Sequence, residues 1–210
     1  MVVVEWLGHA CFRISHDDFS VVIDPFETGA DIRYPPIDVK ADLVLVTHDH
    51  YDHNNVRSIR GNPKIIKGEG EWSDPIPIRG VAASHGPSRG PVTIYRFEMG
   101  KLALCHLGDL GELVDEKLAE RVRPVDILMV PVGGTYTIDG RQADDVIRAL
   151  SPRLAIPMHY GNEYITFSLA TVGDFTAGKK NVRRERTNKL NVTKDTLPST
   201  TTIVVLACPK

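Results

Sequence analysis

The chain has 210 residues, of which 42% are hydrophobic and 25% charged, as in an ordinary soluble globular protein. Its net charge of −2 excludes a strong overall attraction to nucleic acid or to anionic membranes. The three cysteines, Cys11, Cys105 and Cys208, form no CxxC pair, which excludes a disulfide framework or a zinc–thiolate site and indicates a reduced, cytoplasmic protein. The N-terminus lacks the basic region of a signal peptide, and no apolar run reaches the roughly 18 residues of a membrane-spanning helix.

The first half of the chain is predicted to be rich in strands. Short apolar or alternating runs bounded by turn residues are typical of strands. The segment 42–47 (DLVLVT) is apolar almost throughout, which indicates a strand covered on both faces. We therefore expect strands over residues 2–7, 11–15, 19–23, 42–47, 76–84, 91–99 and 101–106.

The pattern changes after residue 106. Helical spacing is predicted for 112–121, with Leu113, Leu118 and Val122 on one side, and for 143–150. Strands are expected at 127–130, 154–157 and 202–206. A helix is expected at 164–175, although its β-branched residues lower the helix propensity. Strands followed by strand–helix alternation indicate sheets enclosed by helical layers in an α/β protein.

The stretch 179–194 is the one local charge anomaly, with seven Lys or Arg residues and a single acid, Glu185. The simplest interpretation is a solvated loop. The alternative is a basic rim that attracts an anionic substrate or nucleic acid.

The strongest functional signal follows the strand 42–47. Three histidines and two aspartates occur within residues 48–53 (HDHYDH). A polar cluster at the end of a buried strand lies at the edge of the sheet, where open sites form. Imidazole and carboxylate groups are ligands for zinc, manganese or iron, so the run predicts a metal site rather than a polar loop.

The spacing His48-X-His50-X-Asp52-His53 resembles the signature of the metallo-β-lactamase superfamily of metal-dependent hydrolases. The residues expected from the superfamily's other motifs also occur in the expected order, each after a predicted strand: Asp24 before this run, and His85, Asp109 and His159 after it. The resemblance therefore covers essentially the whole chain and implies one metallo-β-lactamase-like domain, residues 1–210, with a four-layer αββα sandwich.

Four further segments narrow the resemblance to a branch of small metal-dependent hydrolases similar to ascorbate-6-phosphate lactonase. They are residues 6–10 (WLGHA), 106–109 (HLGD), 131–137 (PVGGTYT) and 156–160 (IPMHY). No inserted domain separates Asp109 from His159, which disfavours a nuclease of the inserted-domain type. A flavodiiron-type oxygen reductase is also disfavoured, because position 50 is His where that group usually has an acid.

The resemblance implies a binuclear site. His48, His50 and His85 would hold one ion; Asp52, His53 and His159 the other; Asp109 would bridge them. Two such ions hold a hydroxide between them, because they lower the pKa of bound water to about 7. That hydroxide would attack an ester-, lactone- or phosphodiester-type bond, with Asp52 and Asp109 as the catalytic carboxylates and Asp52 able to take the proton of the water.

Four other residues are candidates for supporting roles. Asp24 is expected to accept the N–H of a ligand histidine and fix its tautomer, or else to cap the turn before Pro25. His9 and His106, at strand ends, either orient a ligand, meet the substrate or are hydrogen-bonded core histidines. Tyr136, in a glycine-rich loop, either approaches the substrate or belongs to an ordinary strand–helix connection.

The expected cofactors are two divalent ions, with zinc preferred and manganese, nickel or iron as alternatives. The expected partner is a small molecule, with its anionic character and the formation of homo-oligomers left open. The competing functions are an iron-dependent redox enzyme on the same fold and a nuclease, the latter supported only by the stretch 179–194.

Overall fold

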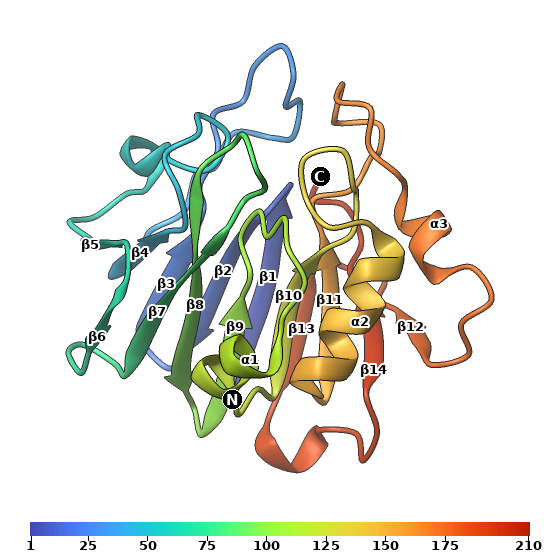
Figure 1. Ribbon diagram of the computed structural model, residues 1–210. Helices are drawn as coiled ribbons and strands as arrows, with labels where there is room; N and C mark the ends of the chain where they lie inside the picture. Colours follow the sequence, from blue (N-terminus) through green and yellow to red (C-terminus); the bar gives the residue numbers. More distant parts are fainter.

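Two mixed β-sheets face each other in the computed structural model, which describes residues 1–210 (Figure 1). The first sheet has six strands, in the order β13 (Lys189–Val192), β1 (Val2–Gly8), β2 (Cys11–His16), β3 (Phe19–Ile23), β4 (Leu43–Val46) and β5 (Lys64–Lys67). The second has eight, in the order β12 (Val182–Arg184), β14 (Thr202–Val205), β11 (Leu154–Met158), β10 (Ile127–Pro131), β9 (Leu102–His106), β8 (Pro91–Met99), β7 (Ile78–Ser84) and β6 (Gly70–Trp72).

The burial of the strands follows the sequence pattern. In β1, Val2, Val4 and Trp6 are buried and alternate with partly exposed residues, as expected for a strand with one face on the core. Strands β9, β10 and β11 are buried at every position, because helices or the other sheet cover both faces. The inward faces form one core cluster of 59 residues, and the expected α/β sandwich is confirmed.

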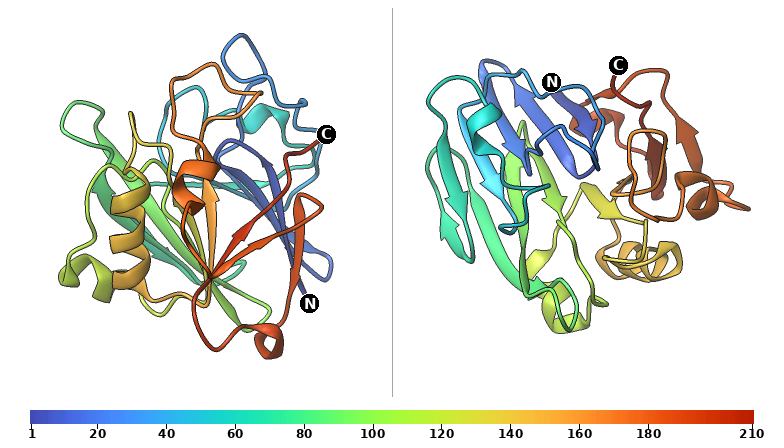
Figure 2. Two further views of the ribbon diagram at one scale, coloured as in Figure 1. Left: turned by 90° about the vertical axis from the view of Figure 1, so that its right-hand side faces the viewer. Right: turned by 90° about the horizontal axis from the view of Figure 1, so that it is seen from above.

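The helical layers of the sandwich are thin. Helix α1 (Glu116–Val122) contacts β7, α2 (Gly140–Leu150) contacts β10, and α3 (Val172–Thr176) contacts α2 (Figure 2). Two 3₁₀ turns, Val56–Ser58 and Lys194–Thr196, complete the helical elements. None of the helices combines the length and apolar character needed to cross a membrane.

Strand direction brings the motif residues to one end of the sandwich. Strands β1 and β3 are both antiparallel to β2, so they run the same way, and β4 is parallel to β3. In the other sheet β7 and β9 are both antiparallel to β8, and β9, β10 and β11 are parallel. The carboxyl ends of β1, β3 and β4 therefore lie at one end of the first sheet, and those of β7, β9, β10 and β11 at one end of the second.

Backbone hydrogen bonds join the two sheets at this end. The N–H of His159, after β11, donates to the carbonyl of His9, after β1, at 3.2 Å. The N–H of Thr93 in β8 donates to the carbonyl of Thr47, after β4, at 2.9 Å. Loops from both sheets consequently meet over one site.

The helix predicted for 112–121 is only partly correct. The helix begins at Glu116, because the Asp115 side chain accepts a hydrogen bond from the N–H of Leu118 and caps it there. The preceding Glu112 instead accepts the N–H of Ser84 at 2.7 Å, which ties this segment to the end of β7. Leu113, expected on the apolar side, is 52% exposed.

The helix predicted for 164–175 is wrong over most of its length, since only Val172–Thr176 is helical. The preceding residues pair with the loop that follows β3. Ile165 forms an antiparallel bridge with Ile32, the N–H of Arg33 donates to Tyr164, and that of Thr166 donates to Asp31. These tertiary hydrogen bonds satisfy the backbone in an extended form, so the weak helix propensity is overridden.

The solvated loop predicted for 179–194 is only partly correct: most of its residues are exposed or half-buried, but two segments of it form strands. The stretch supplies β12 to the eight-stranded sheet and β13 to the six-stranded sheet. Several of its cations pair with acids elsewhere: Lys179 with Asp144 at 2.6 Å, Lys189 with Glu5 at 3.1 Å and Lys194 with Asp126 at 2.7 Å. Its charge is thus partly neutralised locally. The short strands β5 and β6 were not predicted either.

Candidate metal centre

Asp24 organises the floor of the site. It follows β3 and is fully buried, and its two carboxylate oxygens accept the N–H of Thr47 at 2.8 Å and the Thr47 hydroxyl at 2.7 Å. The second of these oxygens also lies 3.0 Å from His53 Nδ1. Asp24 therefore contacts a histidine of the 48–53 run, as the sequence suggested, and links β3 to β4.

These contacts fix the orientation of two histidines. Since the only proton of the Thr47 hydroxyl is donated to Asp24, Thr47 Oγ1 accepts from Nδ1–H of His48, which lies 3.0 Å away. His53 likewise donates Nδ1–H to Asp24. In both rings Nε2 is left facing the site.

The predicted ligands form two groups. Ligand atoms of His48, His50 and His85 lie within 4.8 Å of one another, and so do those of Asp52, His53 and His159, which His9 joins. Each of the two sets expected from the sequence thus lies together, with one additional histidine in the second. A third group, Asp24, His48 and His53, links them.

Asp109 lies between the two groups. Its Oδ2 is 3.4 Å from Nε2 of His85 and 3.9 Å from Nε2 of His48 in the first group. It is also 3.3 Å from Nε2 of His159 in the second, and Oδ1 is 3.3 Å from Nε2 of His53. A single buried carboxylate thus faces both histidine groups, which is the position required of a bridging ligand.

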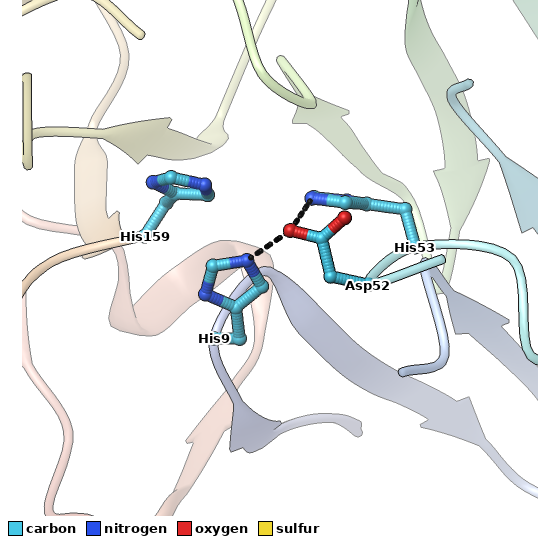
Figure 3. A group of neighbouring side chains, drawn as sticks. All are labelled: His9, Asp52, His53 and His159. Atoms are coloured by element: carbon cyan, nitrogen blue, oxygen red, sulfur yellow. Dashed lines mark hydrogen bonds and ion pairs between the residues drawn. The ribbon is translucent and has the colours of Figure 1, made fainter. Parts of the chain in front are cut away.

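His9 is the addition that the sequence left undecided. Its Nε2 lies 3.3 Å from Oδ2 of Asp52, and its ring centroid is 4.2 Å from that of His159 (Figure 3). His9, Asp24 and His159 all have positive φ, near 50°, which side-chain-bearing residues seldom adopt. Such strain at strand ends is typical of functional sites.

Burial controls protonation in the cluster. It lowers the pKa of His48 to about 3, with His53 adding to the effect, and that of His9 to about 4, with His159 adding. Burial also lowers the pKa of His85 to about 4; the Asp109 carboxylate opposes this shift and Arg89 adds to it. These imidazoles are therefore neutral near pH 7, the form in which histidine binds metals.

His53 is the exception. Burial opposes its charge, but the carboxylates of Asp109 and Asp24 raise its pKa well above the usual range. Burial likewise opposes ionisation of Asp109, yet His159 and His53 hold its pKa well below the usual range. The carboxylates thus favour a positive charge at His53 Nε2, which a metal cation supplies as well as a proton does.

Unpaired buried atoms show that the residues fit a metal. Buried nitrogens normally have hydrogen-bond partners, and each unpaired one costs stability. Here Oδ1 of Asp109 and one ring nitrogen in each of six neighbouring histidines have none: His9, His48, His50, His53, His85 and His159. In His48 and His53 the unpaired atom is the Nε2 that faces the site, so these atoms are available to bind a cation. In His9, His85 and His159 the unpaired atom is Nδ1, whereas Nε2 contacts a carboxylate.

The contacts of His106 are those of a hydrogen-bonded core histidine, one of the three roles considered for it. Its Nε2–H donates to the carbonyl of Ala10 at 2.8 Å, and its Nδ1 accepts the N–H of Gly108 at 3.1 Å. Both ring nitrogens are used, and the residue is fully buried. His106 therefore ties the loop after β1 to the loop that carries Asp109.

Tyr136 lines a cavity beside the site. This cavity, of about 390 Å³, is lined by nine residues: Asp49, His50, Tyr51, Asp52, Arg89, Asp109, Tyr136, His159 and Phe167. The sequence assigned no role, or only an uncertain one, to three residues of the site and its cavity: Thr47 beside His48, and Arg89 and Phe167 in the cavity. The position of Thr47 directly before His48 was the one available signal.

Comparisons with known proteins show the family of this chain. The model of the β-lactamase superfamily domain matches residues 3–159. A UPF0173 metal-dependent hydrolase of Carboxydothermus hydrogenoformans is 31% identical over 82% of this chain and 89% of its own. A second such protein, from Hyperthermus butylicus, is 31% identical over 76% of this chain and 84% of its own.

A solved structure is also similar over nearly the full length. It is a proposed Zn-dependent hydrolase of the metallo-β-lactamase superfamily from Thermotoga maritima, 33% identical, with a TM-score of 0.83 and 98% of each chain covered.

Proposed function

This chain belongs to the β-lactamase superfamily, and we propose on that premise that it is a metal-dependent hydrolase with a binuclear centre. Its relatives in Carboxydothermus and Hyperthermus are named metal-dependent hydrolases, and its structural neighbour in Thermotoga a Zn-dependent one. The observation that carries the proposal is the position of Asp109, whose carboxylate faces both groups of histidines at 3.3–3.9 Å.

The donor set suggests which residues hold the ions. One group is His48, His50 and His85, the other Asp52, His53 and His159, and Asp109 is shared. Nitrogen-rich donors with carboxylates favour zinc, while manganese, nickel and iron accept the same ligands. When bound, such ions lower the pKa of water toward 7, so that a nucleophile is available near neutral pH.

Hydrogen bonds between side chains orient the residues around the metal centre. Asp24 and Thr47 hold His53 and His48 with Nε2 directed inward. His9 donates its Nε2–H to Oδ2 of Asp52. Burial by itself would raise the pKa of Asp52, but this hydrogen bond keeps it below its usual range. Asp52 is thus ionised and placed to take up the proton of the attacking water.

The proposed substrate is a small molecule with an ester-, lactone- or phosphodiester-type bond. The cavity of about 390 Å³ admits a small molecule and is lined by residues of both ligand groups: His50 from the first, and Asp52 and His159 from the second. A nuclease is less favoured, because three of the seven cations of 179–194 pair with acids elsewhere in the chain.

The test is a hydrolase panel run with Zn, Mn, Ni and Fe on the wild-type chain and on His53→Ala. We expect metal-dependent hydrolysis that is lost in His53→Ala. His16→Ala is the matched control, since His16 lies in β2 outside both groups and contacts Met1. Activity unchanged in His53→Ala would overturn the mechanism.

Metal analysis of protein purified without added metal separates the redox alternative. Tightly bound iron with redox-dependent spectra would contradict the hydrolase proposal. Asp52→Ala tests the proton acceptor: we expect turnover to fall, and a variant that retains its metals and its full activity would remove that role.

A further inference from the structure

Arg89 reaches into the cavity from the loop between β7 and β8. The N–H of His85 donates to the carbonyl of Gly90 at 3.0 Å and that of Arg89 to Gly86 at 3.4 Å, so the loop closes tightly on itself. The Arg89 side chain consequently returns over the site, and its Nε lies 3.2 Å from Nε2 of His85. Its guanidinium carbon stands 4.4 Å above the ring centre of Tyr136.

The guanidinium has no carboxylate partner. It forms no ion pair, and its contact with His85 uses only one of the five N–H groups that a guanidinium carries. The nearby Asp49 is engaged elsewhere, with Lys67 Nζ at 2.7 Å and Asn54 Nδ2 at 2.6 Å from its Oδ1. The remaining donors of Arg89 are therefore available to a ligand beside the cluster.

The ring of Tyr136 lies against this cation, and the ring of Phe167 lies beside Tyr136. The ring centroids of Tyr136 and Phe167 lie 6.0 Å apart in an edge-to-face arrangement, and Phe167 is 6.2 Å from His9. Arginine stacked on an aromatic face keeps its edge free for planar, bidentate recognition of a carboxylate or phosphate. Phe167 offers an apolar surface on the same side of the cavity.

We propose that Arg89 is the anion-binding residue of this cavity and that the substrate carries a carboxylate or phosphate group together with an apolar or aromatic group. That the bound anion is a substrate rests on the proposed hydrolase function, whereas binding of the anion requires only the cavity. Arg89 acts as the specificity-determining residue, and Tyr136 supports its guanidinium from below.

The experiment measures binding of non-hydrolysable probes by calorimetry, with zinc-loaded protein and with chelator-treated protein. Benzylphosphonate combines an anion with a ring, phenylacetate replaces the phosphonate by a carboxylate, methylphosphonate lacks the ring, and benzyl alcohol lacks the charge. Zinc content is determined for every sample by elemental analysis.

We expect Arg89→Ala to weaken benzylphosphonate binding about 10- to 100-fold, as loss of a charged hydrogen-bonding partner does. Arg89→Lys should recover part of the loss. Phe167→Ala should reduce the advantage of benzylphosphonate over methylphosphonate. The stronger of the two anionic ring probes identifies phosphate or carboxylate as the preferred group.

Arg33→Ala is the matched control, because Arg33 is an exposed cation whose Nε donates to the carbonyl of Ala30, outside the cavity. Equal weakening by Arg33→Ala, unchanged binding in Arg89→Ala, or equal affinity for benzyl alcohol and benzylphosphonate would each overturn the proposal. An Arg89-dependent difference in protein that binds no zinc would instead contradict the hydrolase proposal and leave the anion site standing.

Discussion

Asp24 shows how one buried carboxylate can determine the geometry of a whole site. It accepts hydrogen bonds from Thr47 and His53 and thereby fixes the ring of His53 and, through Thr47, that of His48. Residues that orient ligand histidines in this way tune metal affinity without touching the metal.

We predict that Asp24→Asn weakens zinc binding by about 10- to 100-fold, because His53 loses the acceptor that holds its Nδ1–H. Competition with a chromophoric chelator measures the affinity. Asp42→Asn is a suitable control: Asp42 accepts from Ser20 at the opposite end of the same strands. Equal weakening in both variants would show a general loss of stability instead.

His106 is predicted to contribute to stability rather than to chemistry. His106→Leu removes both the donor to Ala10 and the acceptor for the N–H of Gly108 and leaves these two buried backbone groups unpaired. We expect the free energy of unfolding to fall by about 2–6 kcal/mol, at about 1–3 kcal/mol for each unpaired group, in urea denaturation. A change in the pH profile of activity without a loss of stability would contradict this role.

The loops after the strands require particular backbone conformations. Gly108, directly before Asp109, has φ +54°, and a Cβ there would lie 2.7 Å from both Thr47 Oγ1 and Val92 Cγ2. Only glycine allows the loop after β9 to pass this close to β4 and β8, which delivers Asp109 to its place between the histidines.

Gly108→Ala should therefore lower both the melting temperature and the metal content of the protein. Gly134→Ala is the matched control: its φ is +64°, but a Cβ would meet nothing nearer than 3.5 Å. Both substitutions carry similar backbone strain, so the difference between them isolates the close approach. Equal metal content in the two variants would argue against the positioning of Asp109 by this contact.

At the scale of the whole molecule, the site closes the gap between the two sheets. His9, Asp24, His48 and Asp52 follow strands of the six-stranded sheet, whereas His85, Asp109 and His159 follow strands of the eight-stranded sheet. Ligands contributed by both sheets mean that bound metal stabilises the folded sandwich and not the unfolded chain.

We predict that zinc raises the melting temperature and that a chelator reverses the increase. At a free zinc concentration 100 times Kd the stabilisation is about 2.7 kcal/mol. We further propose that residues 1–210 fold as one domain, because the 59-residue core cluster includes residues of both sheets. Scanning calorimetry should show a single transition that zinc shifts; two separate transitions, or a zinc-insensitive one, would contradict these statements.

Much of the architecture could be read from periodicity and from strand-end motifs. Most strands of the first half, the α/β class and the polar run 48–53 follow from local patterns, because strand burial and ligand spacing are encoded in consecutive residues. The grouping of His85 with His48 and His50 came instead from the resemblance to the superfamily. The helix expected at 164–175 failed because its backbone is paired with the loop near Asp31, a partner more than a hundred residues away.

By itself the sequence determined the chemical character of the site: a dense set of imidazoles and carboxylates, each placed after a strand. Tertiary structure alone decided which of them face one another. The placement of Asp109 between two histidine groups, the contact of His9 with Asp52 and the return of Arg89 over His85 all depend on loops from both sheets meeting at one end. Distances between segments remote in the chain are set by sheet pairing and packing, which no local pattern of residues encodes.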